Sequence, residues 1–253
     1  MTRAPLLFIS HGAPLIALEE DGFTRAVHDF GQTLDGAPAM VVVSAHWQSR
    51  GLRVNAVARP DPIYDFGGFA PELYTLRYDA PGQPALACEI AQLTGAALEE
   101  ERGWDHGVWV PLRHLRPQGD IPIVELSLPV GADLMPIGRA LAPLRDRGIV
   151  IAGSGGIVHN LRMIHLDHKL APVDPWAAEF DAFIADALER RDFEAIASYR
   201  TRAPNASLAV PTPEHFEPLL VLLGAASESD RVSPIHAAFQ YGNLSMRTFA
   251  LRE

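Results

Sequence analysis

Residues 40–47 read MVVVSAHW, an apolar run that passes through two small residues and reaches a histidine. Consecutive valines without polar alternation are typical of a strand that is covered on both faces, as in a parallel sheet. In open α/β sheets, ligands bind beyond the carboxyl ends of such strands. The stretch therefore predicts a buried strand over residues 40–45 and places His46 where a functional site is expected.

Three other apolar runs predict strands: PLLFIS over residues 5–10, IPIVELSL from Ile121, and IVIA over residues 149–152. The first of these runs ends at His11, and the last is followed by a glycine-rich turn and His159. Apolar spacing predicts helices over residues 84–95 and 175–190. This alternation predicts an α/β fold with a central, mostly parallel or mixed sheet flanked by helices, and with the site at the carboxyl ends of the strands.

The bulk composition limits the class of protein. The chain has 253 residues, 48% of them hydrophobic, and contains no Ser/Gly-rich linker, charge run or internal repeat. We therefore expect a single catalytic domain over residues 1–253. The formal net charge of -10 argues against a nucleic-acid backbone or an anionic membrane surface as a partner.

Cysteine and histidine usage indicates the compartment and the kind of metal site. The lone Cys88 cannot form an internal disulfide, whereas the chain holds 10 histidines. This usage suits a reducing cytoplasm and predicts that any metal is bound by imidazole and carboxylate groups. The apolar run after Arg3 is too short for the core of a signal peptide or for a membrane span, which also predicts a cytoplasmic protein.

An irregular, aromatic segment follows a short strand predicted over residues 52–56. Residues 59–84 are rich in proline and glycine, which argues against regular structure. The segment also holds a set of aromatic residues: Tyr64, Phe66, Phe69, Tyr74 and Tyr78. Because aromatics at this density argue against disorder, we expect a lid or wall over the site. The alternative is an ordered loop that covers a hydrophobic surface elsewhere.

The stretch PTPEHFEPLL, residues 211–220, predicts the start of a helix. Thr212 suits the N-cap and Pro213 the first helical position. His215 then lies in the first turn, where the helix dipole disfavours a protonated imidazole and leaves a lone pair for a metal. A histidine that simply packs beside the cap is the ordinary alternative.

Four histidines are therefore expected at one edge of the sheet: His11, His46, His159 and His215. Three imidazoles with open coordination positions suit catalytic Zn(II) or non-haem Fe(II). His106 lies in a predicted turn, where it either faces the substrate or bonds to Asp105. His165 and His168 could bind a stray metal, but a solvated surface is the simpler interpretation.

The glycine-rich segment AGSGG around Ser154 has two rival interpretations. It is similar to a nucleophile elbow with alanine in the first position, but a serine hydrolase would leave His11 and His46 without a role. The same glycines could cradle a phosphate, yet the third glycine of the dinucleotide fingerprint is missing and no Gly-Lys-Ser/Thr motif occurs.

Six motifs, in this order, carry a family resemblance: FISHGAP, SAHW, YDFGGFAPELYTLRYDAPG, WDHGVWVPL, GSGGIVHNLR and PTPEHFEPLL. With the later GNLSMRTF they cover nearly the whole chain. They resemble the class III extradiol ring-cleavage dioxygenases, in the DOPA-dioxygenase-type branch. One departure is Ala13, which stands where the family has serine in HGSP; the change removes no ligand, and the sequence makes no prediction of its effect on substrate choice.

The resemblance implies the roles of the histidines. The metal ligands correspond to His11, His46 and His215. His159 corresponds to a group at the metal that acts as acid/base catalyst or as a fourth ligand, and His106 to a further active-site group. A related branch uses glutamate as the third ligand, and Glu214 adjoins His215, so the choice between these two rests on the resemblance.

The resemblance also implies a reaction. It implies one divalent metal, Fe(II) for activity with Zn(II) as another ion that the site could bind, and the opening of a 4,5-DOPA-like catechol by O2 to a semialdehyde. Two alternatives stay open, a zinc hydrolase with the same histidines and a non-enzymatic binding module with the same fold. Arg162 or Arg247 could anchor a substrate carboxylate, and the sequence makes no prediction of the oligomeric state.

Overall fold

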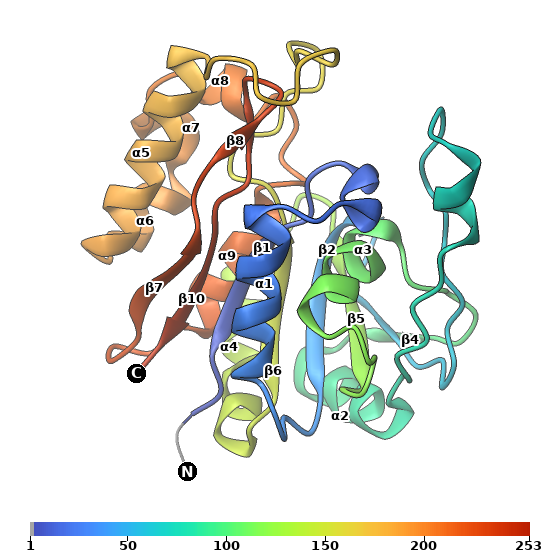
Figure 1. Ribbon diagram of the computed structural model, residues 1–253. Coiled ribbons are helices and arrows are strands. Elements are labelled where there is room, and N and C mark those ends of the chain that lie inside the picture. The colour runs from blue at the N-terminus through green and yellow to red at the C-terminus, as the bar shows by residue number, and fades with distance from the viewer. Residues whose placement is uncertain (1–2) are drawn as a thin grey trace.

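The computed structural model describes residues 3–253, which contain one large mixed sheet (Figure 1). Its eight strands lie in the order β4-β3-β5-β2-β6-β1-β10-β7. The four central strands are parallel: β5 (Ile123–Pro129), β2 (Met40–Ser49), β6 (Val150–Gly155) and β1 (Leu6–Ser10).

On both sides of the centre, the next strand runs antiparallel to the central strands. On one side, β3 (Arg53–Asn55) is antiparallel to β5 and pairs in parallel with β4 (Ala97–Glu99). On the other side, β10 (Thr248–Arg252) is antiparallel to both β1 and β7 (Arg231–His236). A separate pair consists of β8 (Phe239–Gln240) and β9 (Leu244–Ser245). The predicted α/β fold with a mostly parallel, mixed sheet is confirmed.

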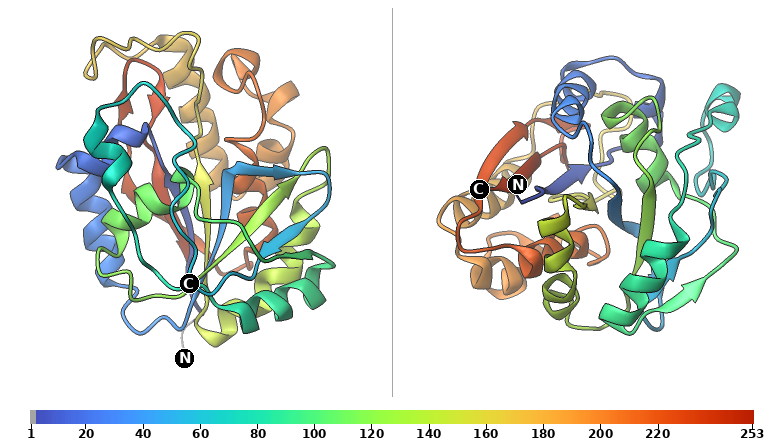
Figure 2. Two further views of the ribbon diagram at one scale, coloured as in Figure 1. Left: turned by 90° about the vertical axis from the view of Figure 1, so that its right-hand side faces the viewer. Right: turned by 90° about the horizontal axis from the view of Figure 1, so that it is seen from below.

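Helices cover both faces of the sheet (Figure 2, right). On one face, α1 (Gly22–Gln32) and α3 (His106–Leu115) share a core with Leu7 and Ile9 of β1. The alternate residues Leu6 and Phe8 belong to the core of the other face. That face is covered by α2 (Pro84–Thr94), α4 (Met135–Leu141), α5 (Pro175–Glu189) and α9 (Glu217–Ala225). Because both faces are buried, the central strands are mostly apolar, as the valine run predicts.

Short helices complete the described part of the chain: α6 (Phe193–Ala197), α7 (Tyr199–Arg202), α8 (Ala206–Ala209), and the 3-10 helices η1 (Pro14–Leu18), η2 (Pro71–Thr75) and η3 (Ala142–Arg147). The helices predicted over residues 84–95 and 175–190 are confirmed, each to within one residue. The first of them ends where Gly95 takes a left-handed φ of 75°. None of the helices within residues 3–253 is long and apolar enough to span a membrane.

The structure differs from the predicted boundaries at four places near the site. β2 continues beyond residue 45, so His46 lies inside the strand, and β6 continues through the glycine-rich segment to Gly155. His106 is the first residue of α3 and does not lie in a free turn. α9 begins only at Glu217, because Pro218 supplies the early helical proline, so His215 lies in the turn before the helix.

The aromatic segment is an ordered wall. η2 is its one helix, and all of the segment is described; Leu73 and Tyr78 are buried. The segment is fixed to α3, since the indole N–H of Trp109 donates to the carbonyl oxygen of Ile63 over 3.1 Å. The hydroxyl of Tyr64 donates to the carbonyl oxygen of Leu76 over 2.8 Å. The segment therefore covers a hydrophobic surface of α3, and the same residues border the cavity described next.

Candidate active site

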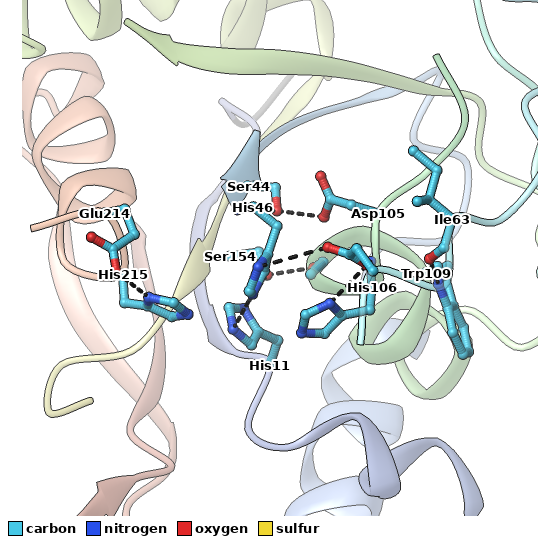
Figure 3. A network of polar contacts seen from close by, with 12 residues as sticks. His11, Ser44, His46, Ile63, Asp105, His106, Trp109, Ser154, Glu214 and His215 are labelled. Atoms are coloured by element: carbon cyan, nitrogen blue, oxygen red, sulfur yellow. Dashed lines mark hydrogen bonds and ion pairs between the residues drawn. The ribbon is translucent and has the colours of Figure 1, made fainter. Parts of the chain in front are cut away.

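A cavity of about 570 Å³ lies at the carboxyl ends of the central strands, and five histidines line it. They are contributed by the end of β1, the interior of β2, the first position of α3, the loop after β6 and the turn before α9. In that order they are His11, His46, His106, His159 and His215. Figure 3 shows the rings of four of them converging. Every histidine that the sequence singled out for the site thus reaches one cavity.

His11 directly follows β1, where the chain turns sharply. Gly12 has a left-handed φ of 58°, and a Cβ at this position would lie 2.2 Å from Ile16. On the neighbouring strand β6, the hydroxyl of Ser154 donates to the carbonyl oxygen of Gly107 and lies 3.1 Å from Nδ1 of His11. The hydroxyl has no second proton, so it accepts from Nδ1–H, and the lone pair of His11 is on Nε2.

β2 bulges away from β5 at the position of His46. The register of the two strands shifts between Val43 and Gln48. The hydroxyl of Ser44 stabilises the bulge, because it donates to the carboxylate of Asp105 over 2.6 Å and accepts from the backbone N–H of His46 over 3.2 Å. This bulge lets a residue within a central strand direct its ring into the cavity.

The beginning of α3 packs directly on the bulge. A Cβ at Gly107 would lie 2.5 Å from Oγ of Ser44 and 3.0 Å from the ring of His46, so only glycine permits this approach. Asp105, at the N-cap position, does not cap the helix with its side chain. Its carboxylate binds Ser44 and accepts from Arg102 over 2.9 Å.

His106 is held by a residue that the sequence did not single out, Asp65 of the aromatic segment. Oδ1 of Asp65 accepts from the backbone N–H of His106 over 3.0 Å and lies 2.9 Å from its Nδ1. Oδ2 lies 3.7 Å from Nδ1 of His46. The alternative in which His106 bonds to Asp105 is wrong. The only feature of the sequence that could have indicated Asp65 is the position of an acidic residue between two aromatic residues, Tyr64 and Phe66.

His215 is fixed from two sides. Its carbonyl oxygen accepts from the N–H of Gly156 over 2.8 Å, and a Cβ at Gly155 would lie 2.2 Å from that oxygen. The glycines after Ser154 therefore permit close packing of this turn. Glu214 accepts from Thr212 over 2.7 Å and lies 3.1 Å from Nδ1 of His215. Although burial acts in the opposite direction, these hydrogen bonds lower the pKa of Glu214 to about 2.

The cavity disfavours protonation of four of its histidines, His11, His46, His159 and His215. Burial, reinforced by the neighbouring His106 and His215, lowers the pKa of His46 from 6.5 to about 3. Burial likewise lowers the pKa values of His11 and His159 well below the ordinary value. For His215 burial again lowers the pKa, with Glu214 opposing the shift, so burial replaces the helix dipole as the cause. Neutral imidazoles carry the lone pairs that metal coordination needs.

The nitrogen atoms fit a divalent metal. Nε2 of His11 and Nε2 of His46 lie 3.1 Å apart, and the contact with Ser154 assigns the lone pair of His11 to its Nε2. Two nitrogens that share one metal ion at about 2.1 Å lie roughly 3.0–3.4 Å apart, so the observed separation suits a shared ion. Nε2 of His215 is buried and has no hydrogen-bond partner in the described structure. The ligand-type nitrogens of His11, His46 and His106 lie within 4.8 Å of one another.

His159 differs from the other histidines of the cavity. Its ring stacks on that of His215, with centroids 3.5 Å apart and planes 6° apart. Its backbone N–H donates to the carbonyl oxygen of Ala209 over 3.0 Å, which fixes the loop after β6. Side-chain hydrogen bonds to its ring nitrogens are absent among the described residues, so the ring can exchange a proton with a bound molecule.

Other candidates from the sequence do not have the roles considered for them. Ser154 is buried inside β6, and the next helix begins only at Pro175, so the nucleophile elbow is wrong. Arg247 forms an ion pair with Asp181, with a shortest distance of 2.5 Å, and neither it nor the exposed Arg162 lines the cavity. His165 and His168 are exposed and also lie outside it.

The remaining wall of the cavity suits a flat, apolar molecule. Phe66 and Phe69 of the aromatic segment line one part, and Phe66 meets the ring of His106 edge-on with centroids 5.6 Å apart. Other lining residues are Leu161, Ile164, Leu166, Tyr241 and Leu244. Aromatic and aliphatic walls around a few polar groups are typical of small-molecule sites.

Comparison with known proteins identifies related sequences and a related fold. The family described as the catalytic LigB subunit of aromatic ring-opening dioxygenase matches residues 5–248. The 4,5-DOPA dioxygenase extradiol of Escherichia coli (strain K12) is 39% identical, with 97% of this chain and 93% of that protein covered. The enzyme of the same name from Beta vulgaris is 38% identical, with 96% and 94% covered. The crystal structure of an uncharacterized Escherichia coli K12 protein superimposes with a TM-score of 0.83 at 34% identity, covering 98% of this chain and 99% of that one.

Proposed function

Since this chain belongs to the family of the catalytic LigB subunit of aromatic ring-opening dioxygenases, and is an extradiol ring-cleaving enzyme, we propose that its substrate is a substituted catechol of the 4,5-DOPA type. The relatives named above supply this substrate class. The observation that carries the proposal is the close approach of Nε2 of His11 and Nε2 of His46, beneath an aromatic wall.

We propose that His11, His46 and His215 hold the metal. Nε2 of His11 and Nε2 of His46 lie 3.1 Å apart, and His215 presents a buried Nε2 without a protein partner among the described residues. Glu214 is better suited to orient His215 than to replace it, because it binds Nδ1 of that ring and is absent from the cavity lining. Fe(II) is expected for activity because Zn(II) has no redox chemistry, although imidazole ligands accept both ions.

The bound metal would hold the catechol and O2 together and conduct electron density between them. The chain's own residues prepare the substrate. His159, neutral and without a side-chain partner among the described residues, takes a proton from a catechol hydroxyl at a ring nitrogen and returns it to the product. His106 presents Nε2 to the bound substrate. Phe66 and Phe69 contact the face of the catechol ring and exclude water. In the alternative role, His159 is a fourth ligand.

Two wider features of the protein belong to the same proposal. We propose that residues 1–253 act as one catalytic domain, because β1 and β10, from distant parts of the sequence, are neighbours in one sheet. A reducing, cytoplasmic compartment suits an exposed free thiol at Cys88 and an oxidisable metal.

The test is oxygen uptake by anaerobically purified protein that is loaded with Fe(II) and given L-DOPA or another substituted catechol. Stoichiometric uptake with formation of the yellow ring-opened semialdehyde is expected. Tight metal binding without uptake across several catechols would favour the zinc hydrolase. Protein that binds no metal would favour the binding module.

A further inference from the structure

The carboxylate of Asp65 connects the aromatic segment to two histidines of the cavity. One oxygen, Oδ1, receives the backbone N–H of His106 at 3.0 Å and lies 2.9 Å from Nδ1 of the same residue. The other oxygen, Oδ2, lies 3.7 Å from Nδ1 of His46. The side chain of His106 is buried, whereas that of Asp65 is 25% exposed at the cavity. A carboxylate in this place is not needed to fill an apolar core.

The contact determines which nitrogen of His106 carries the proton. An ionised carboxylate has no proton to donate, so the group opposite Oδ1 must be Nδ1–H. In the neutral ring the lone pair is then on Nε2. Nε2 is also the nitrogen left to face the cavity, where His106 provides a ligand-type atom within 4.8 Å of those of His11 and His46. Without the carboxylate, the two neutral forms of an imidazole have similar energies, and the ring can rotate.

We propose that Asp65 is a positioning residue, whose carboxylate holds His106 in the Nδ1–H form so that Nε2 accepts a hydrogen bond from the substrate inside the cavity. The proposal rests on the proposed function for the identity of that substrate. It assigns a role to the aromatic segment beyond that of a wall, because the segment orients a cavity histidine through Asp65. The role resembles that of carboxylates that orient histidines at catalytic centres, whose loss typically costs about 10- to 100-fold in activity.

The experiment compares Asp65→Ala and Asp65→Asn with Asp61→Asn as the matched control. Asp61 lies in the same segment, but its side chain is 80% exposed and pairs with Arg77. In Asp65→Asn, the amide oxygen can still accept both N–H groups of His106, whereas the alanine variant accepts neither. Thermal unfolding first establishes that each variant is folded.

The readout that a merely structural role would not change is the protonation pattern of His106. Long-range ¹H–¹⁵N spectra of metal-free, ¹⁵N-histidine-labelled protein distinguish Nδ1–H from Nε2–H rings, and the signal of His106 is assigned by its loss in His106→Gln. We expect Nδ1–H in the wild type, Asp61→Asn and Asp65→Asn, and a mixture in Asp65→Ala. With Fe(II) and a catechol, kcat of Asp65→Ala should fall about 10- to 100-fold with KM changed less, and Asp65→Asn should recover most of it.

Two results would overturn the proposal. One is an Nδ1–H ring at His106 in Asp65→Ala, whatever the activity, because the carboxylate would then not select this form. The other is an Asp65→Asn variant that keeps the Nδ1–H ring but is as slow as Asp65→Ala. The spectra do not depend on ring cleavage. If the wild type fails to consume oxygen with any catechol, the proposed function fails while the role of Asp65 is still decided by the spectra.

Discussion

Three of the cavity histidines are each held at the nitrogen that faces away from the cavity. Ser154 lies at Nδ1 of His11, Asp65 at Nδ1 of His106 and Glu214 at Nδ1 of His215. Such contacts fix both the ring orientation and the protonated nitrogen, and they leave Nε2 as the acceptor. His159 lacks such a contact among the described residues and stacks on a neighbouring ring. This difference separates rings suited to binding from a ring suited to moving a proton.

The difference predicts opposite losses in two alanine variants. His46→Ala should lose the metal, because its Nε2 faces that of His11 at 3.1 Å. His159→Ala should keep the metal and lose about 10²- to 10⁴-fold in kcat, as expected for removal of a general base. Metal content measured beside oxygen uptake tests both, with His168→Ala, an exposed histidine outside the cavity, as control. Equal metal content and equal activity in the two variants would contradict these roles.

At the scale of elements, the bulge of β2 depends on the beginning of α3. Ser44 binds Asp105 at the N-cap position, and Gly107 lets the helix approach until a Cβ would lie 2.5 Å from Oγ of Ser44. The helix therefore acts as a support that determines where the ring of His46 lies. The contact joins residues 61 positions apart in the sequence.

Gly107→Ala should displace this support. We expect a loss of about 1–3 kcal/mol in the free energy of unfolding, as for other overpacked sites, together with weaker metal binding. Urea unfolding and metal titration measure the two effects. Gly51→Ala is the control, because a Cβ at Gly51 meets nothing within 4 Å. Unchanged metal affinity in a destabilised Gly107→Ala variant would separate the bulge from the metal site.

The same elements show what the sequence can and cannot predict. The valine run predicts β2, and histidines after strands predict the site, because hydrophobic burial and strand direction are local consequences of composition. The continuation of β2 through His46 was not predictable, since it depends on the distant contact of Ser44 with Asp105. The start of α9 was misplaced because Thr212-Pro213 and Phe216-Glu217-Pro218 are both acceptable starts, and packing decides between them. Asp65 was missed because its partner lies 41 residues away.

At the scale of the whole molecule, the negative net charge extends into the cavity. Lysine and arginine are absent from the described residues that line it, whereas Asp65 is present. A substituent carboxylate that lies against these walls, away from the proposed metal, loses hydration without meeting a lysine or arginine side chain, which disfavours its binding. The cavity walls therefore favour catechols whose ring substituent is apolar where it contacts them.

A matched pair of catechols tests this consequence. The two compounds, 4-ethylcatechol and dihydroxyphenylpropionate, differ by one carboxylate, and we expect the ethyl compound to show the lower KM, by about tenfold. Oxygen uptake at varied substrate concentration gives both values. A lower KM for the carboxylate would point to a cation outside the described lining, and Arg162→Gln would then identify whether the mouth supplies it.

The neutral histidines also make the fold sensitive to acid. Burial lowers the pKa of His46 to about 3, so below the ordinary value of 6.5 the unfolded chain binds a proton that the folded chain excludes. The free energy of unfolding of metal-free protein should therefore fall as the pH falls below about 6.5, by roughly 2 kcal/mol for this residue at about pH 5. The lowered pKa values of Asp65 and Glu214, about 2 each, act only in stronger acid. Urea unfolding should show a smaller pH dependence in His46→Gln; an equal dependence would exclude His46 as a cause.

The pairing of β1 with β10 determines when the site can be completed during synthesis. The N–H of Ser10 donates to Oγ1 of Thr248 over 3.1 Å, and these residues are 238 positions apart. His11 is therefore the first of the cavity histidines to be translated, yet its strand lacks this neighbour until β10 has emerged from the ribosome. Pairings of such long sequence separation form late in folding. A nascent chain stalled before β10 would consequently carry the five cavity histidines without the strand that pairs with β1.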